Sequence, residues 1–338
     1  MRKNTISGLK SQLNTKSKVS IIGHKNPDGD ALGSTLGLSL FLKQLGISSQ
    51  VIMPNGYPDF LKWLPAVDGI LCYDTDKTEC EKVLQDSDFI FTLDFNHLDR
   101  TGSGLGNFLK NLDSRFIMID HHQEPADYAS FMLVDTQVAS TCELVHEFVT
   151  TQYSEVELTA DIASCLYTGI MTDTGSFRFP STTSKTHRII ADLIDAGANN
   201  SQIHQDTYDN NAESRLHLLG KALQNLKVIR EFSTAYTFLS QEDLNANGFK
   251  KGDTEGFVNY ALSLKGIKFA VIFIENKAED IVKISFRSIG DFDVNTFARK
   301  HYSGGGHKNA AGGKSDLDLN STLEKFENTL NNYREALT

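Results

Sequence analysis

The stretch Arg115-Phe116-Ile117-Met118-Ile119-Asp120-His121-His122 joins an apolar run to three polar residues. A short apolar run of this kind, bounded by polar residues, predicts a buried strand. The triplet Asp120-His121-His122 then stands where that strand ends. Because two adjacent histidines after an aspartate contribute little to the packing of a core, the triplet indicates a functional site.

A second strand-like segment, residues 18–23, also ends in polar residues. It leads into His24, Asp28 and Asp30, and apolar residues then recur at helical spacing over residues 30–45. His24 and Asp28 are four residues apart and could converge on one metal ion, while Asp30 would meet a second. The alternative for Asp30 is that it caps the following helix.

Two more aspartates follow apolar segments. Asp94 ends the strand-like segment 88–94, and Asp173 ends an apolar helical run and begins a turn rich in glycine and serine. Taken singly, each could be a turn residue or a helix-end residue. Together with the histidine-containing segments, however, the two aspartates indicate a metal site.

The first half of the chain alternates strand-like and helix-like segments. Predicted strands cover 18–23, 50–53, 88–94 and 116–120, and predicted helices cover 30–45, 80–85 and 106–112. This order predicts a parallel sheet with helices on both faces. In such sheets, ligands bind at the carboxyl ends of the strands. His24, Asp94 and Asp120 all fall at such ends, so we expect them at one edge of the sheet.

At 338 residues the chain is long enough for two domains. Residues 139–212 are predicted to be mostly helical, 214–228 form a further helix, and a second region of strands and helices follows. The predicted fold class is therefore α/β. The expected divisions are a parallel-sheet domain over 1–196, a helical connector over 197–230 and a smaller α/β C-terminal domain over 231–338.

The acidic and histidine residues have the chemistry of a metal site. Oxygen and imidazole ligands without thiolate suit Mn²⁺ or Mg²⁺ better than structural zinc. The negative charges of Asp28, Asp30, Asp94 and Asp173 match the charge of two divalent ions. Two ions roughly 3.5–4 Å apart and bridged by one carboxylate would activate a water and hold a phosphoryl group. Positive groups for the phosphate must come from elsewhere.

A glycine-rich segment near the C-terminus could supply those groups. It contains Gly304, Gly305, Gly306 and His307. Consecutive glycines let backbone N–H groups approach a ligand, and such nests bind anions. Arg287 and Ser288, at the end of a predicted strand, could join His307. The small pair Ala310-Ala311 would allow a helix or turn to pack tightly. The alternative is a flexible glycine loop.

Composition excludes several other classes of protein. The net charge of −10 argues against a protein that grips long nucleic acid, although it allows a small anionic ligand. No apolar run reaches the roughly 18 residues that a membrane span needs. The N-terminus has no apolar region typical of a signal peptide. The four cysteines form no C-x-x-C pair, so free thiols in a reducing cytoplasm are expected.

Together these motifs resemble the DHH phosphoesterase superfamily over nearly the whole chain. The N-terminal catalytic domain of that superfamily is matched by His24, Asp28-Gly29-Asp30, Asp94, Asp120-His121-His122 and Asp173. Its associated C-terminal domain is matched by Arg287-Ser288 and the segment 304–312. The chain looks most like the bacterial oligoribonucleases that also act as pAp phosphatases, and these are similar to RecJ-like and exopolyphosphatase-related proteins.

The resemblance implies a role for each of these residues. One metal ion would be held by His24, Asp28 and Asp94, and the other by Asp30, Asp94, His121 and Asp173, with Asp94 as the bridge. Asp120 would orient neighbouring ligands, and His122 would face the phosphate and stabilise charge in the transition state. The terminal phosphate or nucleotide of the substrate would be bound by Arg287, Ser288, Gly304, Gly305, Gly306 and His307.

The implied activity is metal-dependent hydrolysis in a cleft between the two domains, by two-metal activation of a water. The substrates would be short oligoribonucleotides, cut to mononucleotides, and 3′-phosphoadenosine 5′-phosphate (pAp), converted to AMP. The cofactors would be two divalent cations, Mn²⁺ first and Mg²⁺ as the alternative. The expected partner is short RNA or a nucleotide, with no long double-stranded nucleic acid and no membrane, and a homodimer stays open.

Other functions stay open beside this one. A phosphodiesterase for cyclic or linear dinucleotides would use the same site. An exopolyphosphatase or pyrophosphatase is less favoured, because the glycine-rich segment suggests an organic ligand. A nucleotide-binding regulator without catalysis would lack metal ligands, and none is missing from the motifs.

Overall fold

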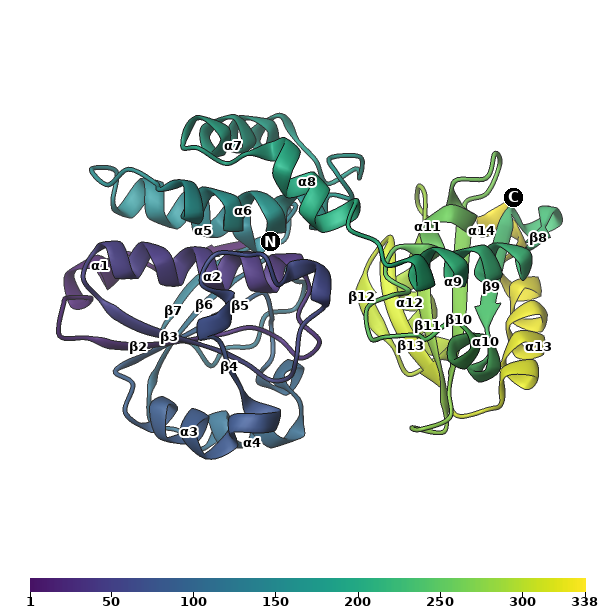
Figure 1. Ribbon diagram of the computed structural model, residues 1–338, viewed down its shortest axis with the longest axis horizontal. Coiled ribbons are helices and arrows are strands. Elements are labelled where there is room, and N and C mark those ends of the chain that lie inside the picture. The colour runs from purple at the N-terminus through teal and green to yellow at the C-terminus, as the bar shows by residue number, and fades with distance from the viewer. The chain divides into compact units, whose positions relative to one another are not determined.

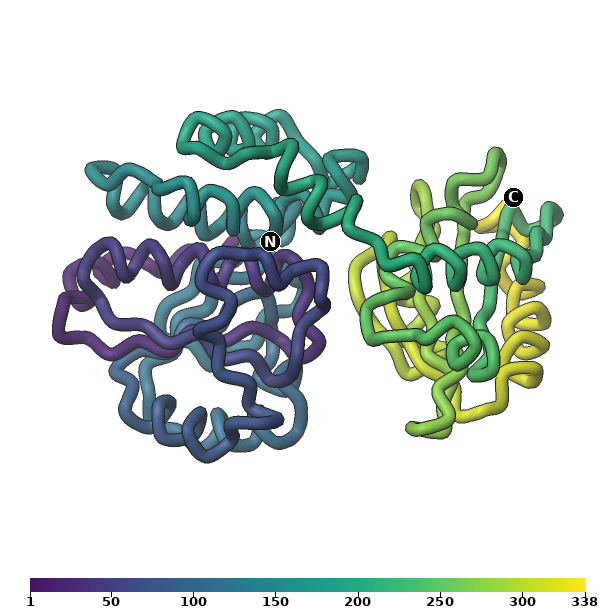
Figure 2. The backbone as a smooth tube through the Cα atoms, viewed as in Figure 1, coloured from purple at the N-terminus to yellow at the C-terminus, as the bar shows by residue number.

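The computed structural model describes residues 1–338 and divides into two compact units, Met1–Asn210 and Asn211–Thr338. Each unit contains one sheet with its own helices (Figure 1), and one chain segment leads from the first unit into the second (Figure 2). The division falls inside the segment 197–230 that the sequence predicts as a connector. The predicted α/β fold class is confirmed.

The first unit contains a seven-stranded sheet in the order β1-β7-β6-β5-β2-β3-β4. Its strands are β1 (Arg2–Asn4), β2 (Lys18–Ile22), β3 (Ser48–Met53), β4 (Leu71–Cys72), β5 (Phe89–Leu93), β6 (Arg115–Asp120) and β7 (Phe131–Asp135). Every neighbouring pair is parallel except β1 with β7. The predicted parallel sheet is therefore confirmed, but it has three strands that the sequence did not predict: the parallel β4 and β7, and the short antiparallel β1 at the edge.

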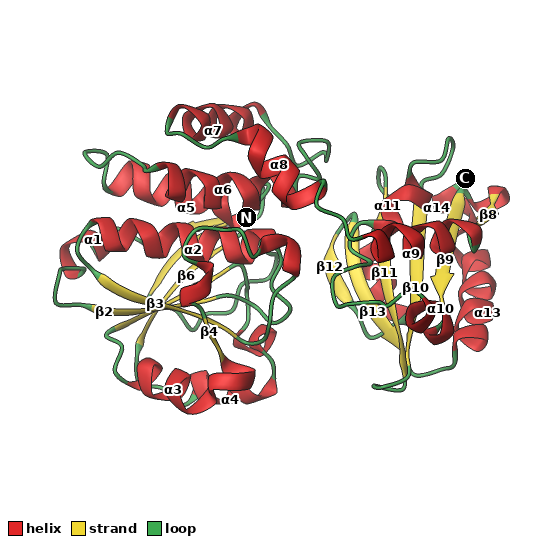
Figure 3. Ribbon diagram, in the orientation of Figure 1, coloured by secondary structure: helices red, strands yellow, loops and turns green.

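Helices cover both faces of this sheet (Figure 3). They are α1 (Leu9–Gln12), α2 (Gly29–Gln44), α3 (Tyr73–Gln85), α4 (Ser103–Lys110), α5 (Thr141–Gln152), α6 (Ala160–Asp173), α7 (Ser184–Asp195) and α8 (Asn200–Tyr208). In the figure, α3 and α4 lie on one side, while α1, α2, α5 and α6 lie on the other, with α7 and α8 farther out. None of the helices combines the length and the apolar character that a membrane span requires.

The apolar strand sequences follow from burial on both faces. In β2, Ile21 packs into the core beneath α2, α5 and α6, whereas Ile22 packs into the core against α3 and α4. In β5, Phe91 packs into the same core as Ile21, and Ile90 packs into the same core as Ile22. Because successive side chains of a strand point to opposite faces, a strand covered on both sides reads as a continuous apolar run.

Glycines allow α2 and α6 to pack closely against each other. A Cβ at Gly33 in α2 would overlap the carbonyl oxygen of Cys165 in α6. A Cβ at Gly169 in α6 would overlap the Cys142 sulfur and approach Asp30 Oδ1 to 2.9 Å. The close approach of α2 and α6 therefore requires residues without a side chain at these two positions. It brings the start of α2 beside the end of α6.

The second unit contains a six-stranded sheet in the order β12-β13-β11-β10-β9-β8. Its strands are β8 (Lys227–Ile229), β9 (Thr234–Leu239), β10 (Phe269–Asn276), β11 (Ile281–Ser288), β12 (Gly305–His307) and β13 (Ala310–Ser315). Only β9 and β10 pair in parallel. Its helices are α9 (Glu213–Gln224), α10 (Gln241–Ala246), α11 (Phe257–Leu262), α12 (Val294–His301), α13 (Leu319–Leu330) and α14 (Arg334–Leu337).

The glycine-rich segment differs from the prediction. It forms a hairpin of β12 and β13, so Ala310 and Ala311 lie in a strand and not in the helix or turn that the sequence allowed. A Cβ at Gly304 would overlap the carbonyl oxygen of Gly312. Gly306 has a φ of 151°, and a Cβ there would lie 2.5 Å from the carbonyl oxygen of Ala310. The glycines thus let two strands approach closely, although glycine in general disfavours strands.

Candidate active site

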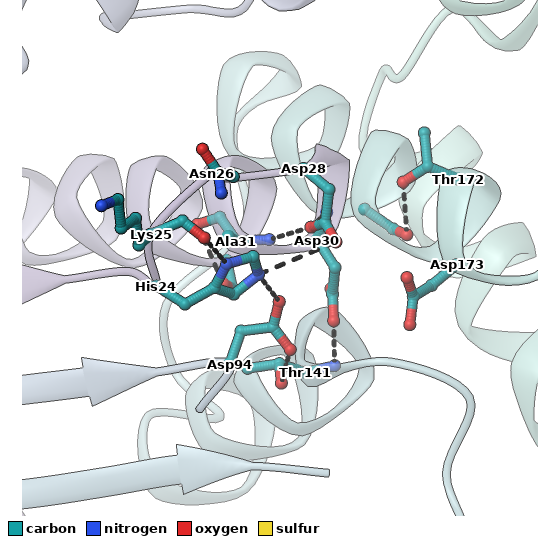
Figure 4. Close-up of polar contacts among 12 residues, drawn as sticks. His24, Lys25, Asn26, Asp28, Asp30, Ala31, Asp94, Thr141, Thr172 and Asp173 are labelled. Carbon is teal, nitrogen blue, oxygen red and sulfur yellow. Dashed lines mark hydrogen bonds and ion pairs between the residues drawn. The ribbon is translucent and has the colours of Figure 1, made fainter. Parts of the chain in front are cut away.

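The predicted metal-ligating residues of the first unit gather at the carboxyl edge of its sheet. They come from five places in the fold: His24 after β2, Asp28 and Asp30 at the start of α2, Asp94 after β5, His121 after β6 and Asp173 at the end of α6. Figure 4 shows His24, Asp28, Asp30, Asp94 and Asp173 converging on a small space. The parallel order of β2, β5 and β6 brings three of these segments to one edge.

Asp94 lies at the centre of this cluster. Its Oδ2 is 3.3 Å from His24 Nε2, and its Oδ1 is 3.4 Å from His121 Nε2. Its backbone has a φ of 65°, a left-handed conformation that aspartate tolerates better than most side chains. Non-glycine residues held in this region are enriched at functional sites, because surrounding structure must stabilise them. Asp94 therefore offers one oxygen to each of two histidines.

The first group of ligand atoms belongs to His24, Asp28 and Asp94, which lie within 4.8 Å of one another. His24 Nδ1 donates to the Lys25 carbonyl at 3.0 Å, so Nε2 is the nitrogen that faces the carboxylates. Asp28 Oδ2 is 3.7 Å from this Nε2, while Oδ1 accepts from the backbone of Asp30 at 3.1 Å. Asp28, and not Asp30, is thus the residue that caps α2.

The second group belongs to Asp30, Asp94 and His121, which also lie within 4.8 Å of one another. His121 Nε2 is 3.8 Å from Asp30 Oδ2 and 3.4 Å from Asp173 Oδ2. The Asp30 carboxylate accepts from the backbone N–H groups of Thr141 at 2.6 Å and Cys142 at 2.9 Å. Backbone N–H groups in the first turn of α5 therefore hold the Asp30 carboxylate, which lies in the first turn of α2.

Buried negative charge dominates the electrostatics of the cluster. Burial, and then the charge of Asp94, raise the pKa of Asp30 well above its usual range. Burial also raises the pKa of Asp173 to about 8, although His121 opposes the change. Burial alone would lower the pKa of His24, but hydrogen bonds to Asp28 and Asp94 raise it well above its usual value. Carboxylates crowded in this way are stabilised by bound positive charge.

The donor set fits divalent metal ions. Carboxylate oxygens and imidazole nitrogens are arranged in two groups that share Asp94, and the donor atoms lie close enough to surround a small ion. In addition, Asp120 Oδ2 is buried and has no hydrogen-bond partner. Hard oxygen donors with imidazole suit Mn²⁺ and Mg²⁺. The residues present are thus sufficient for two cations.

His122 is held by its neighbour Asp120. The imidazole Nδ1 donates to Asp120 Oδ1 at 2.8 Å, and the carboxylate is fully buried. This bond identifies Nδ1 as the protonated nitrogen and fixes the orientation of the ring. The two histidines of the triplet therefore face different partners, because His121 Nε2 lies near the carboxylates of Asp30, Asp94 and Asp173.

The predicted substrate-binding residues lie on neighbouring strands of the second unit. Ala310 in β13 pairs with Arg287 on one side and with His307 on the other. Residues paired across strands share a face of the sheet, so Arg287 and His307 flank the small Ala310 from strands about 10 Å apart. Ser288 alternates to the opposite face, where its buried hydroxyl donates to the Phe292 carbonyl at 2.6 Å.

Comparison with known proteins places the chain in a family. The sequence matches the DHH family, N-terminal domain, over residues 18–170 and the DHHA1 domain over residues 233–337. A Thermus thermophilus protein named bifunctional oligoribonuclease and PAP phosphatase NrnA is 31% identical over 320 residues, which cover 94% of this chain and 90% of that protein. The chain belongs to the DHH family.

Solved structures agree with this assignment. An exopolyphosphatase-related protein from Bacteroides fragilis superposes with a TM-score of 0.91 at 37% identity, covering 95% of this chain and 94% of the other. RecJ from Thermus thermophilus, in complex with Mn²⁺, has a TM-score of 0.54 at 13% identity, covering 98% of this chain and 54% of RecJ, and it shares the fold. The predicted resemblance is confirmed, and the DHH protein is a phosphoester hydrolase by class.

Thr141 and Cys142 of this DHH protein contact the cluster but are absent from the predicted site. Besides the backbone bonds to Asp30, Thr141 Oγ1 donates to Asp94 Oδ1 at 3.0 Å. The sequence Ser140-Thr141-Cys142-Glu143 carries the signature of a helix start, and Ser140 does cap α5. That signal predicts the helix, but nothing local predicts that it lies beside Asp94, 47 positions earlier, and Asp30, 111 positions earlier.

Proposed function

We propose that this protein hydrolyses short oligoribonucleotides to mononucleotides and pAp to AMP. The single observation that carries the proposal is Asp94, which presents one carboxylate oxygen to each of two histidine-containing groups. This arrangement is suited to the cleavage of a phosphoester by two cations. The choice of substrate is supported by the name of the Thermus thermophilus relative, an oligoribonuclease and PAP phosphatase.

The cations in this proposal are two Mn²⁺ ions, with Mg²⁺ as the alternative. His24, Asp28 and Asp94 would hold one ion, and Asp94 with Asp30, His121 and Asp173 would hold the other. When bound, the ions would supply activation of a water and neutralisation of charge on the phosphoryl group. The Mn²⁺ complex of RecJ supports the choice of metal.

His122 is proposed to donate a hydrogen bond to the phosphate, with Asp120 as its orienting partner. In the Asp120→Asn variant, the amide no longer holds the proton of His122 on Nδ1 as the carboxylate does. The value of kcat should therefore fall about 10- to 100-fold, with little change in KM. Steady-state kinetics on pAp would measure this. The exposed Asp99→Asn variant is the control. A kcat equal to that of the wild type would remove Asp120 from this role.

The row formed by Arg287, Ala310 and His307 is proposed to bind the phosphate or nucleotide end of the substrate. The small Ala310 leaves room between two side chains that can donate hydrogen bonds. The glycines 304–306 would contribute by letting β12 and β13 approach closely, since the N–H groups of Gly304 and Gly306 already donate to the Ala298 carbonyl at 3.3 Å and to Asn295 Oδ1 at 3.0 Å. Ser288 would support this row through the turn, since its hydroxyl accepts from Asn309 Nδ2 at 2.8 Å.

The His307→Ala variant should raise KM for pAp about tenfold and change kcat less, because it removes a binding interaction shared by the ground and transition states. Initial rates over a range of pAp concentrations would separate the two constants. Lys314→Ala, which alters an exposed cation elsewhere on β13, is the matched control. An unchanged KM in His307→Ala would contradict the binding role.

One substrate panel tests the function itself. Purified protein with Mn²⁺ would be given pAp, a diribonucleotide, a pentaribonucleotide, cyclic di-AMP and pyrophosphate, each with and without a chelator. We expect turnover of pAp and of both oligonucleotides, abolished by the chelator. Preferred turnover of cyclic di-AMP or of pyrophosphate would replace the proposed substrate, and chelator-resistant turnover would contradict the metal mechanism.

We also propose that the protein acts in the cytoplasm. All four cysteines are free thiols, and three of them are buried. Free, unpaired cysteines are typical of proteins in reducing compartments.

A further inference from the structure

We propose that Thr141 is a positioning residue that fixes the bridging carboxylate of Asp94 and thereby sets the affinity of one of the two metal-binding groups. The inference rests on the proposed function, since it assumes that the cluster binds two cations. Thr141 is fully buried, and it is the first residue of α5. In Figure 4 its side chain lies directly against Asp94.

The contact acts on one particular oxygen of Asp94. Thr141 Oγ1 donates to Oδ1 at 3.0 Å, and Oδ1 is also the oxygen that lies 3.4 Å from His121 Nε2. A carboxylate oxygen has acceptor capacity for more than one partner, so the bond to Thr141 leaves a direction open for a cation. The bond prevents the carboxylate from turning about its terminal torsion, which is otherwise broad.

Threonine is well suited to this task. Its branched side chain has few accessible χ1 rotamers, so the hydroxyl is directed before any ligand binds. Its position at the start of α5 also places its backbone N–H on Asp30 Oδ2 at 2.6 Å. One residue therefore holds two carboxylates, Asp30 and Asp94, through two different donor groups. The positive end of the helix dipole adds to their stabilisation.

The two metal-binding groups are therefore supported by different helices. The group around His121 depends on α5, because both Asp30 and Asp94 Oδ1 accept hydrogen bonds from Thr141. The group around His24 depends on α2, because Asp28 is the N-cap of that helix. Loss of the Thr141 hydroxyl should thus weaken cation binding most in the His121 group, and less in the His24 group, which uses the other oxygen of Asp94.

The test is a Mn²⁺ titration of the full chain, with free Mn²⁺ counted by electron paramagnetic resonance. Wild type should bind two ions. Thr141→Val, which keeps the shape and removes the hydroxyl, should bind the first ion with an affinity near that of the wild type and the second about 10- to 100-fold more weakly. Thr141→Ser should restore the second site. Thr35→Val is the control, because Thr35 is a buried threonine whose hydroxyl donates to the Ala31 carbonyl away from the cluster.

Each outcome has a definite meaning. Two sites of wild-type affinity in Thr141→Val would overturn the positioning role, and so would equal weakening of both sites. If Thr141→Val does not fold, Thr141→Ser and Thr141→Ala, which differ only by the hydroxyl, make the same comparison. Absence of Mn²⁺ binding in wild type would instead contradict the proposed function, so the two failures are distinguishable.

Discussion

Replacing Asp94 with asparagine should lower kcat on pAp by about a thousandfold or more, since one side chain serves both metal-binding groups. The amide keeps the shape of the carboxylate but lacks its charge, so neither His24 nor His121 retains an anionic partner at this position. Asparagine also tolerates the left-handed backbone at residue 94, where φ is 65°. The fold should therefore be retained, and the variant should lose catalytic rate without losing stability.

A matched control is available for this variant. Asp280 also has a left-handed backbone, with a φ of 53°, and it lies in the turn between β10 and β11 of the second unit. Asp280→Asn makes the same chemical change at the same type of backbone position and should leave kcat unaltered. Single-turnover rates with Mn²⁺ and circular dichroism would be measured for both. Mn²⁺-dependent turnover near the wild-type rate in Asp94→Asn would contradict the assignment.

The second large effect concerns the packing of α2 against α6. Gly33→Ala should destabilise the first unit by about 1–3 kcal/mol, because the added Cβ would overlap the carbonyl oxygen of Cys165. A backbone oxygen cannot move aside by a change of side-chain rotamer. Relief of that overlap requires α2 and α6 to separate, which moves Asp30 relative to Asp173. A displacement of about 1 Å in a catalytic site costs on the order of a hundredfold in rate, so kcat should fall as well.

Gly220→Ala provides the opposite case. Gly220 lies within α9, and a Cβ there would meet no atom within 4 Å. Alanine in a helix interior is favoured over glycine by about 0.5–1 kcal/mol, so this variant should stabilise the second unit. Hydrogen exchange would follow the two units separately. If the backbone amides of α2 and α6 are as well protected from hydrogen exchange in Gly33→Ala as in the wild type, the predicted destabilisation is wrong.

Much of the first unit could be predicted because its signals are local. Ile21 and Ile22 pack into opposite cores, so β2 reads as a continuous apolar run, and the polar residue that ends the run marks the edge of the sheet. The parallel order then brings His24, Asp94 and Asp120 together without further information. The hydrolase class follows from these same residues and the family match.

The remainder depends on contacts that a single sequence does not show. The role of Thr141 arises from a hydrogen bond to Asp94 across 47 positions. The hairpin of β12 and β13 runs against the low strand propensity of glycine, because close backbone approach outweighs that propensity. The sequence offered Asp30 as a possible cap of α2, but the helix begins at Gly29, so Asp28 is the cap.

The measurement that tests the central claim most directly is anomalous diffraction from crystals of the full chain grown with Mn²⁺. We predict two anomalous peaks, one beside Asp94 Oδ2 next to His24 and one beside Asp94 Oδ1 next to His121. A single peak, or two peaks that do not share the Asp94 carboxylate, would contradict the account.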